Sequence, residues 1–293
     1  MLALLSAAAC GEAKGAGPDR VLEHTYATAV AALDAAAGIR LEHTVPVVLL
    51  TRQEALERRR TFAAGLAQGA GATRSVDQLV DVFLSGGNFV GKYFPDEHVV
   101  YVFKDVLGDD WYEAPRESQE LFSTVTHELV HAHDDQVYDV IPDPLEVLAR
   151  LAADDASQLE SQAVLMAILE GHATWATELA CQKVGHPAPR PLTMEDVRNV
   201  DAFDGDGQPL LDGLAAAGNV IVGLKYLQYV QGREFCRRAM TFGGEPFMRE
   251  VFTHLPVSRE ELADFDLFKL RWAAQKEAEL DAPSQAKPSE SGG

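Results

Sequence analysis

Two histidines and a glutamate within one short stretch have the types and spacing needed for metal-dependent chemistry. His127 and His131 are four residues apart in the segment Phe122-Ser-Thr-Val-Thr-His-Glu-Leu-Val-His131. On a helix they lie one above the other, so both imidazoles can reach one metal ion. Glu128 follows about 100° further round the helix, where it can reach a water molecule bound to that metal. The segment therefore predicts a metal-binding helix with a general base beside the ligands.

A catalytic zinc ion takes three protein ligands and one water molecule, so a third ligand must come from another element. Glu170 is the strongest candidate, because it follows an apolar helical stretch, Ala163 to Leu169. A carboxylate is costly to bury there unless it is paired or bound to metal. Gly171 beside it would permit close packing against the metal-binding helix. We expect the nearby acidic residues to lie on solvated faces instead: Asp155, Glu160 and Glu178.

The elements around these residues predict an α+β, mostly helical fold. The segment 163–169 and the stripe of Phe122, Val125 and Leu129 have helical spacing. Val99 to Phe103 is the clearest strand, and we expect it to border the active-site cleft and to take an extended substrate by strand addition. Capping boxes at Thr51–Glu54 and Ser258–Glu261 begin further helices, and residues 219–240 predict a helix that Gly243 and Gly244 end.

The two motifs together resemble those of the gluzincins, which include thermolysin-like peptidases and zinc aminopeptidases. Glu170-Gly-His-Ala-Thr174 is similar to an Asn-Glu-Gly-Phe-Ala segment of the aminopeptidases, in which the Glu binds zinc. A closer resemblance is to a group of bacterial secreted proteins with His-Glu-Leu-x-His-Ala-x-x-Asp-Gln, then Glu-Gly-x-Ala-Thr. The segment from His127 to Gln136 matches the first of these patterns. The resemblance implies Zn²⁺, a peptide or protein substrate, and a zincin-like core with a small sheet whose edge strand flanks the active-site helix.

Residues that orient the ligands and stabilise the oxyanion are less well defined. Thermolysin-like enzymes have an Asp four residues after the zinc Glu, and Thr174 occupies that position here. Asp134 or Asp135, on the same helical side as His131, could orient a ligand instead. His172 should face away from the metal, about 200° from Glu170 round the helix. Candidates for the oxyanion donor are Tyr226 and Tyr229. Tyrosines at such positions are more often core residues or residues at the rim of a site.

The sequence thus favours zinc-dependent hydrolysis of peptide bonds by a metal-activated water, with Glu128 as the general base and His127, His131 and Glu170 as ligands. The alternative is a zinc-binding protein of zincin fold with a binding or structural role and little turnover. A third interpretation is a helical protein with a chance motif, in which Glu170 is a helix-surface residue.

Composition limits the other classes of function. The formal net charge is −20, which argues against a nucleic-acid partner, because such partners need a basic face. Residues 1–10 form a short apolar run that ends in Cys10 and resembles a lipoprotein signal, with 11–19 as a tether. We therefore expect a zincin-like peptidase domain at 20–280 and a disordered tail at 281–293. The protein should be extracytoplasmic, either anchored to a bacterial membrane through lipid on Cys10 or secreted. Cys181 and Cys236 would then be a disulfide or two buried thiols.

Overall fold

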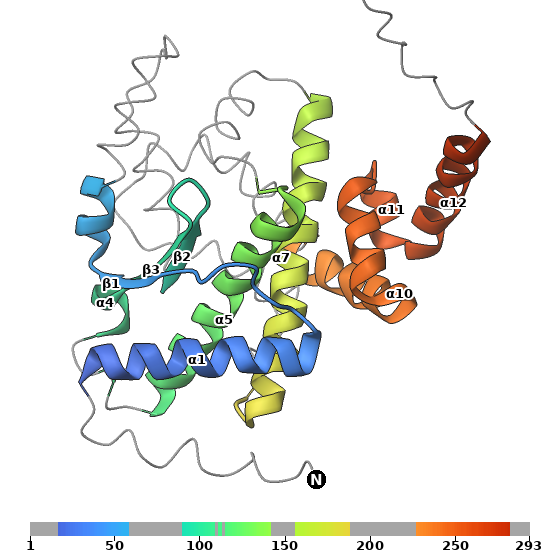
Figure 1. Ribbon diagram of the computed structural model, residues 1–293. Helices are drawn as coiled ribbons and strands as arrows, with labels where there is room; N and C mark the ends of the chain where they lie inside the picture. Colours follow the sequence, from blue (N-terminus) through green and yellow to red (C-terminus); the bar gives the residue numbers. More distant parts are fainter. Residues whose placement is uncertain are drawn as a thin grey trace, which may run out of the picture.

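A computed structural model describes residues 17–58, 90–108, 111–112, 115–141, 156–187 and 227–281. Most of this part of the chain is helical, with one three-stranded sheet, as the α+β, mostly helical expectation requires (Figure 1). The expected signal, most of the tether and nearly all of the tail lie outside the described residues, and so does Cys10. None of the described helices is long and apolar enough to cross a membrane.

The sheet has the strand order β1-β3-β2. Strand β1 (Val47–Leu50) runs parallel to β3 (Val99–Phe103), and β2 (Gly91–Phe94) runs antiparallel to β3. All five residues of β3 are buried. The expectation that Val99–Phe103 is an edge strand bordering the cleft is therefore wrong. Its apolar side chains point to both faces without alternation, which is typical of a strand covered on both sides and paired on both edges.

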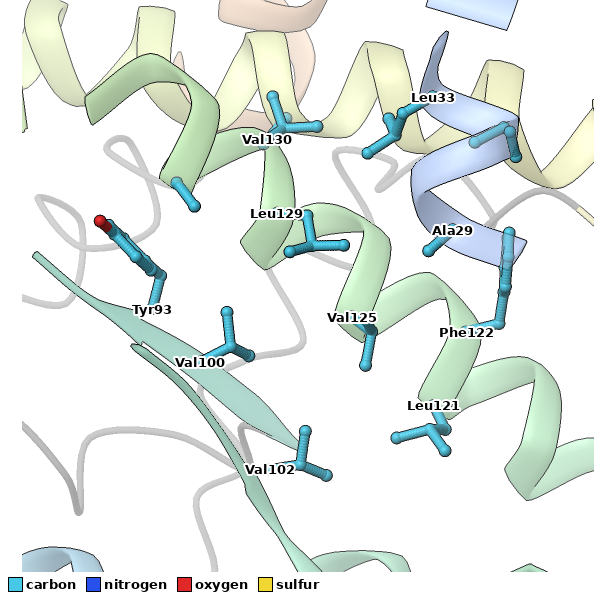
Figure 2. Close-up of a cluster of buried hydrophobic side chains, with 14 of the residues drawn as sticks. Ala29, Leu33, Tyr93, Val100, Val102, Leu121, Phe122, Val125, Leu129 and Val130 are labelled. Carbon is cyan, nitrogen blue, oxygen red and sulfur yellow. The ribbon is translucent and has the colours of Figure 1, made fainter. Parts of the chain in front are cut away.

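Three helices build the main core with the sheet. They are α1 (Pro18–Ala37), α5 (Pro115–Tyr138) and α7 (Ala156–Val184). Figure 2 shows Leu121, Val125 and Leu129 of α5 pointing toward the strands, where Val100 and Val102 meet them. On its other side α5 contacts α1 through Phe122. The predicted apolar stripe thus packs α5 between the sheet and the other two helices, and this packing fixes the direction in which the polar residues of α5 point.

The C-terminal part packs on the other side of α7 as a second core (Figure 1). It comprises the short π-helix η2 (Leu227–Gly232), α10 (Arg233–Thr253), α11 (Arg259–Ala263) and α12 (Phe265–Asp281). The expected helix break at Gly243–Gly244 is confirmed, because non-helical dihedral angles at Gly244 divide α10 into two helical segments, the second ending at Thr253. Gly244 adopts φ 64° and makes a kink, which a glycine does without the steric cost of a side chain.

Candidate metal centre

The side chains of His127, His131 and Glu170 meet where α5 lies against α7. His127 Nε2 is 3.1 Å from Glu170 Oε2 and 3.2 Å from His131 Nε2, and His131 Nε2 is 3.8 Å from Glu170 Oε1. One ligand atom from each residue lies within 4.8 Å of the others, and the described part of the chain contains no other such group. Two imidazoles and one carboxylate are a donor set that suits a catalytic zinc ion. The three residues could therefore hold a metal ion.

The electrostatics of this trio favour an ionised carboxylate. Burial opposes the charge of Glu170, but the hydrogen bond from His127 and the positive charges of both histidines lower its pKa to about 2. Burial likewise opposes a charge on His127, but the hydrogen bond and charge of Glu170 raise the pKa of that imidazole above its usual value. At His131 burial prevails and lowers the pKa. The carboxylate is thus ready to bind a cation without first losing a proton.

Glu128 is held by the backbone of the sheet. The N–H of Tyr93 donates to Glu128 Oε2 at 2.6 Å, and the Tyr93 hydroxyl donates to Asp135 Oδ2 at 2.6 Å. In an antiparallel pair alternate N–H groups point away from the partner strand, and that of Tyr93 points to α5. The edge strand beside Glu128 is therefore β2, whereas β3 was expected to be the strand that borders the cleft.

Tyr93 was not among the site residues expected from the sequence. Its strand, Gly91-Lys-Tyr-Phe94, precedes a four-residue turn and then β3. Two short β-rich runs joined by such a turn are typical of a hairpin, and this pattern could have identified the strand that carries Tyr93. The contact of its backbone with Glu128 has no signature in the sequence, because any residue except proline carries that N–H.

Tyr229 on η2 lies close enough to Glu170 for the two side chains to interact. The negative charge of Glu170, reinforced by burial, raises the pKa of the phenol well above its usual value, so the hydroxyl keeps its proton. The other candidate oxyanion donor, Tyr226, lies outside the described residues. Of the two tyrosines, the structure therefore brings Tyr229 to the candidate centre.

Close contact between α7 and η2 brings Tyr229 into this position. A Cβ built on Gly171 would lie 2.1 Å from the Gly232 carbonyl carbon, and one built on Gly232 would lie 1.8 Å from the Ala167 oxygen. The expectation that Gly171 packs against the metal-binding helix is wrong, since its neighbour is η2. The two glycines let the backbones of α7 and η2 touch, and π-helical turns are frequent at functional sites.

The residues proposed to orient the ligands have other partners. Asp134 is fully buried and accepts hydrogen bonds from His172 and His133, and Asp135 accepts one from Tyr93. The hydrogen bonds described for these two carboxylates do not reach His127 or His131. Thr174 is half-buried, four residues after Glu170, and no described contact joins it to the trio. His172 faces Asp134, which fits the expectation that it is not a ligand.

Two further expectations are decided by packing. Glu178 is buried and pairs with Arg233 at 2.7 Å and 2.5 Å, so the solvated face expected for it is wrong. Its partner is 55 residues away in the chain, and the local sequence does not reveal it. Cys181 and Cys236 are both buried free thiols, which decides between the two alternatives left open. Burial raises the pKa of Cys181 to about 11.

Comparison with known proteins supports the fold. No family model matches the sequence, and no curated protein matches it. A solved structure from Chloroflexus aurantiacus, described as "a putative hydrolase with a novel fold", is similar with a TM-score of 0.52 and 15% sequence identity. The similarity covers 88% of this chain and 89% of that one. At this identity it shows that the two chains share a fold and nothing more specific.

Proposed function

We propose that this protein is a zinc-dependent peptidase of the gluzincin type. The observation that carries the proposal is the meeting of His127, His131 and Glu170 beside Glu128, in a site where the three ligands are 13% to 20% exposed. A site that is neither sealed nor fully open can admit a water molecule and a substrate. Hydrolysis as the general class is also supported by the description of the Chloroflexus aurantiacus protein that shares the fold.

Zinc, when bound, would lower the pKa of a water molecule to about 7 and polarise the substrate carbonyl. Glu128 acts as the general base. The Tyr93 N–H occupies Oε2, which leaves Oε1 to accept a proton from water and deliver it to the leaving amine. Because the hydrogen bond fixes the carboxylate, the base needs little reorientation before it reacts.

Tyr229 supplies the oxyanion donor in this proposal. Its hydroxyl lies beside Glu170 and stays protonated, so it can donate to the oxygen on which negative charge develops. A donor placed in advance at such an oxygen is a large contribution to many acyl-transfer reactions.

The test begins with the metal. Purified wild type should contain about one zinc ion per chain, and it should hydrolyse members of a peptide library in a reaction that a chelator stops and added zinc restores. Glu170→Ala should lose most of the zinc, because two histidines alone do not complete the site. Glu120→Ala is the control, because Glu120 is an exposed glutamate on α5, the helix of the two histidines.

Each outcome has a clear meaning. If Glu170→Ala retains zinc as tightly as wild type does, Glu170 is not a ligand and the gluzincin assignment fails. Zinc bound by wild type without turnover of any peptide would favour the alternative, a zinc-binding protein of zincin fold. Absence of zinc and of other divalent metals from wild type would leave the motif without a function.

A further inference from the structure

A second cluster of polar side chains lies in the interior beside the metal centre. Asp134 Oδ1 and Oδ2 are 2.9 Å and 3.1 Å from His172 Nδ1, and Oδ1 is 3.1 Å from His133 Nδ1. The side chains of Asp134 and His172 are completely inaccessible to solvent. A buried carboxylate needs such partners, since an isolated one would be very costly.

Within the described residues, the hydrogen bonds of the His172 ring go to Asp134. His172 Nε2 is buried and has no hydrogen-bond partner there. Trp175 stacks on the ring with centroids 6.0 Å apart, and Phe252 contacts it edge-on at 6.1 Å. A nitrogen without a partner in an apolar surround is unfavourable, so packing alone would favour an apolar residue here. The bond to Asp134 is therefore what distinguishes histidine from leucine at this position.

This bond connects the two helices that supply the metal ligands. Asp134 follows His131 by three residues on α5, and His172 follows Glu170 by two residues on α7. His133 holds the same carboxylate from within α5, so it fixes the carboxylate but does not link the helices. A shift of α7 along α5 that moved Glu170 from the histidines would have to break the Asp134–His172 bond.

We propose that Asp134 and His172 are a positioning pair, which sets the distance between Glu170 and the two histidines without touching the metal. The inference rests on the proposed function, in that His127, His131 and Glu170 bind a metal ion. It differs from direct orientation of a ligating histidine by a carboxylate, because Asp134 acts across the helix interface. Partners outside the ligand shell typically change metal affinity about 10–100-fold.

Two substitutions of His172 separate the hydrogen bond from packing. His172→Asn keeps an N–H donor near the place of Nδ1 but loses most of the ring. His172→Leu keeps much of the volume but loses the donor. Both should lower the thermal midpoint. Zinc affinity should fall roughly 10–100-fold in His172→Leu and stay within a few-fold of wild type in His172→Asn. The visible absorption spectrum of the Co²⁺-loaded protein should change in the leucine variant only.

Glu178→Gln is the matched control for a purely structural effect. Glu178 is a buried carboxylate on α7 as well, but its partner Arg233 belongs to α10 and not to the metal-binding helix. This variant should lose thermal stability without a change in zinc affinity or in the cobalt spectrum.

The outcomes distinguish the two proposals. If wild type binds zinc and the affinity of every variant simply follows its thermal midpoint, Asp134 and His172 have a structural role only and the positioning proposal is overturned. If the leucine variant binds zinc like wild type, the positioning proposal also fails while the proposed function stands. If wild type binds neither zinc nor cobalt, both proposals fail together.

Discussion

The backbone N–H of Tyr93 donates a 2.6 Å hydrogen bond to the carboxylate of Glu128. This contact joins the sheet to the candidate base through the backbone nitrogen of Tyr93, which remains when the Tyr93 side chain is replaced. The Tyr93 hydroxyl reinforces it through Asp135, which lies two helical turns after Glu128 on α5. The sheet thus contributes to the site by fixing one oxygen of the base.

Replacing the base tests the chemistry. Glu128→Gln should bind zinc like wild type, because the amide oxygen can still accept the Tyr93 N–H and the ligands are unchanged. Peptide hydrolysis should fall about 10²–10⁴-fold, since only the general base is lost. Steady-state kinetics with zinc analysis of the same samples measures both effects. Glu120→Gln, on the exposed side of α5, should be fully active. Full activity of Glu128→Gln would show that Glu128 is not the base.

Replacing Tyr229 tests the oxyanion donor. Tyr229→Phe removes one hydroxyl beside Glu170 and should lower kcat about 10²–10³-fold while KM changes little. Zinc content should stay at the wild-type level, because the phenol is not needed as a ligand. Tyr112→Phe, at a half-buried tyrosine packed on Trp111, is a control for loss of a hydroxyl elsewhere. A rise in KM of the same size, with kcat unchanged, would instead make Tyr229 a substrate-binding residue.

The local features of the fold could be predicted from the sequence. The box at Thr51–Glu54 forms as expected, with Thr51 N–H donating to the Glu54 carboxylate at 2.6 Å and Glu54 N–H to the Thr51 hydroxyl at 3.1 Å. The helix of His127 and His131 follows from the spacing of its residues, and the buried place of Glu170 beside them follows from the cost of burying an unpaired carboxylate. Each of these patterns depends on neighbours within a few turns of the same helix, which the sequence displays directly.

Features that depend on distant partners could not be predicted. The central place of β3 follows from parallel pairing with β1, about 50 residues earlier in the chain. The neighbour of Gly171 is Gly232, and the partner of Glu178 is Arg233. A single sequence shows that glycine or a carboxylate is present but not which remote backbone or guanidinium it meets. For this reason the Tyr93 contact and the Asp134–His172 bond emerged only from the structure.

Adding one methyl group between α7 and η2 should be strongly destabilising. Gly232 has helical dihedral angles (φ −58°, ψ −46°), so an alanine there suffers no backbone strain, but its Cβ would lie 1.8 Å from the Ala167 oxygen. Gly232→Ala should reduce the free energy of unfolding by about 1–3 kcal/mol or more. Activity should fall too, because η2 carries Tyr229. Denaturant titration measures the stability change.

The control for this prediction is Gly17→Ala, at the start of α1. A Cβ on Gly17 would meet nothing within 4 Å, so no clash arises, but Gly17 is the N-cap of α1, where alanine is less favourable than glycine, and the expected loss is about 0.5–1 kcal/mol. Equal effects of the two alanines would mean that the contact between α7 and η2 is looser than described.

Zinc should stabilise the folded protein, because its ligands come from two helices that separate on unfolding. At a free zinc concentration about 100 times the dissociation constant, binding should add about 2.7 kcal/mol to the free energy of unfolding. Calorimetry with and without a chelator measures the shift. Glu170→Ala should lose most of it, whereas Glu120→Ala should keep it. A thermal midpoint that zinc leaves unchanged in wild type would argue against binding to the native state.

The two buried thiols lie in different hydrophobic cores, so the reactivity of each thiol reports the local opening of its own core. Cys181 belongs to the core that α1 and α5 share with the sheet, and Cys236 to the core built by α7 and α10. Neither can react with a thiol reagent until its own region opens, since burial excludes the reagent and raises both thiol pKa values. With Cys10 replaced by serine, pulsed alkylation would time the two openings separately and show whether the two halves of the molecule unfold as one cooperative unit.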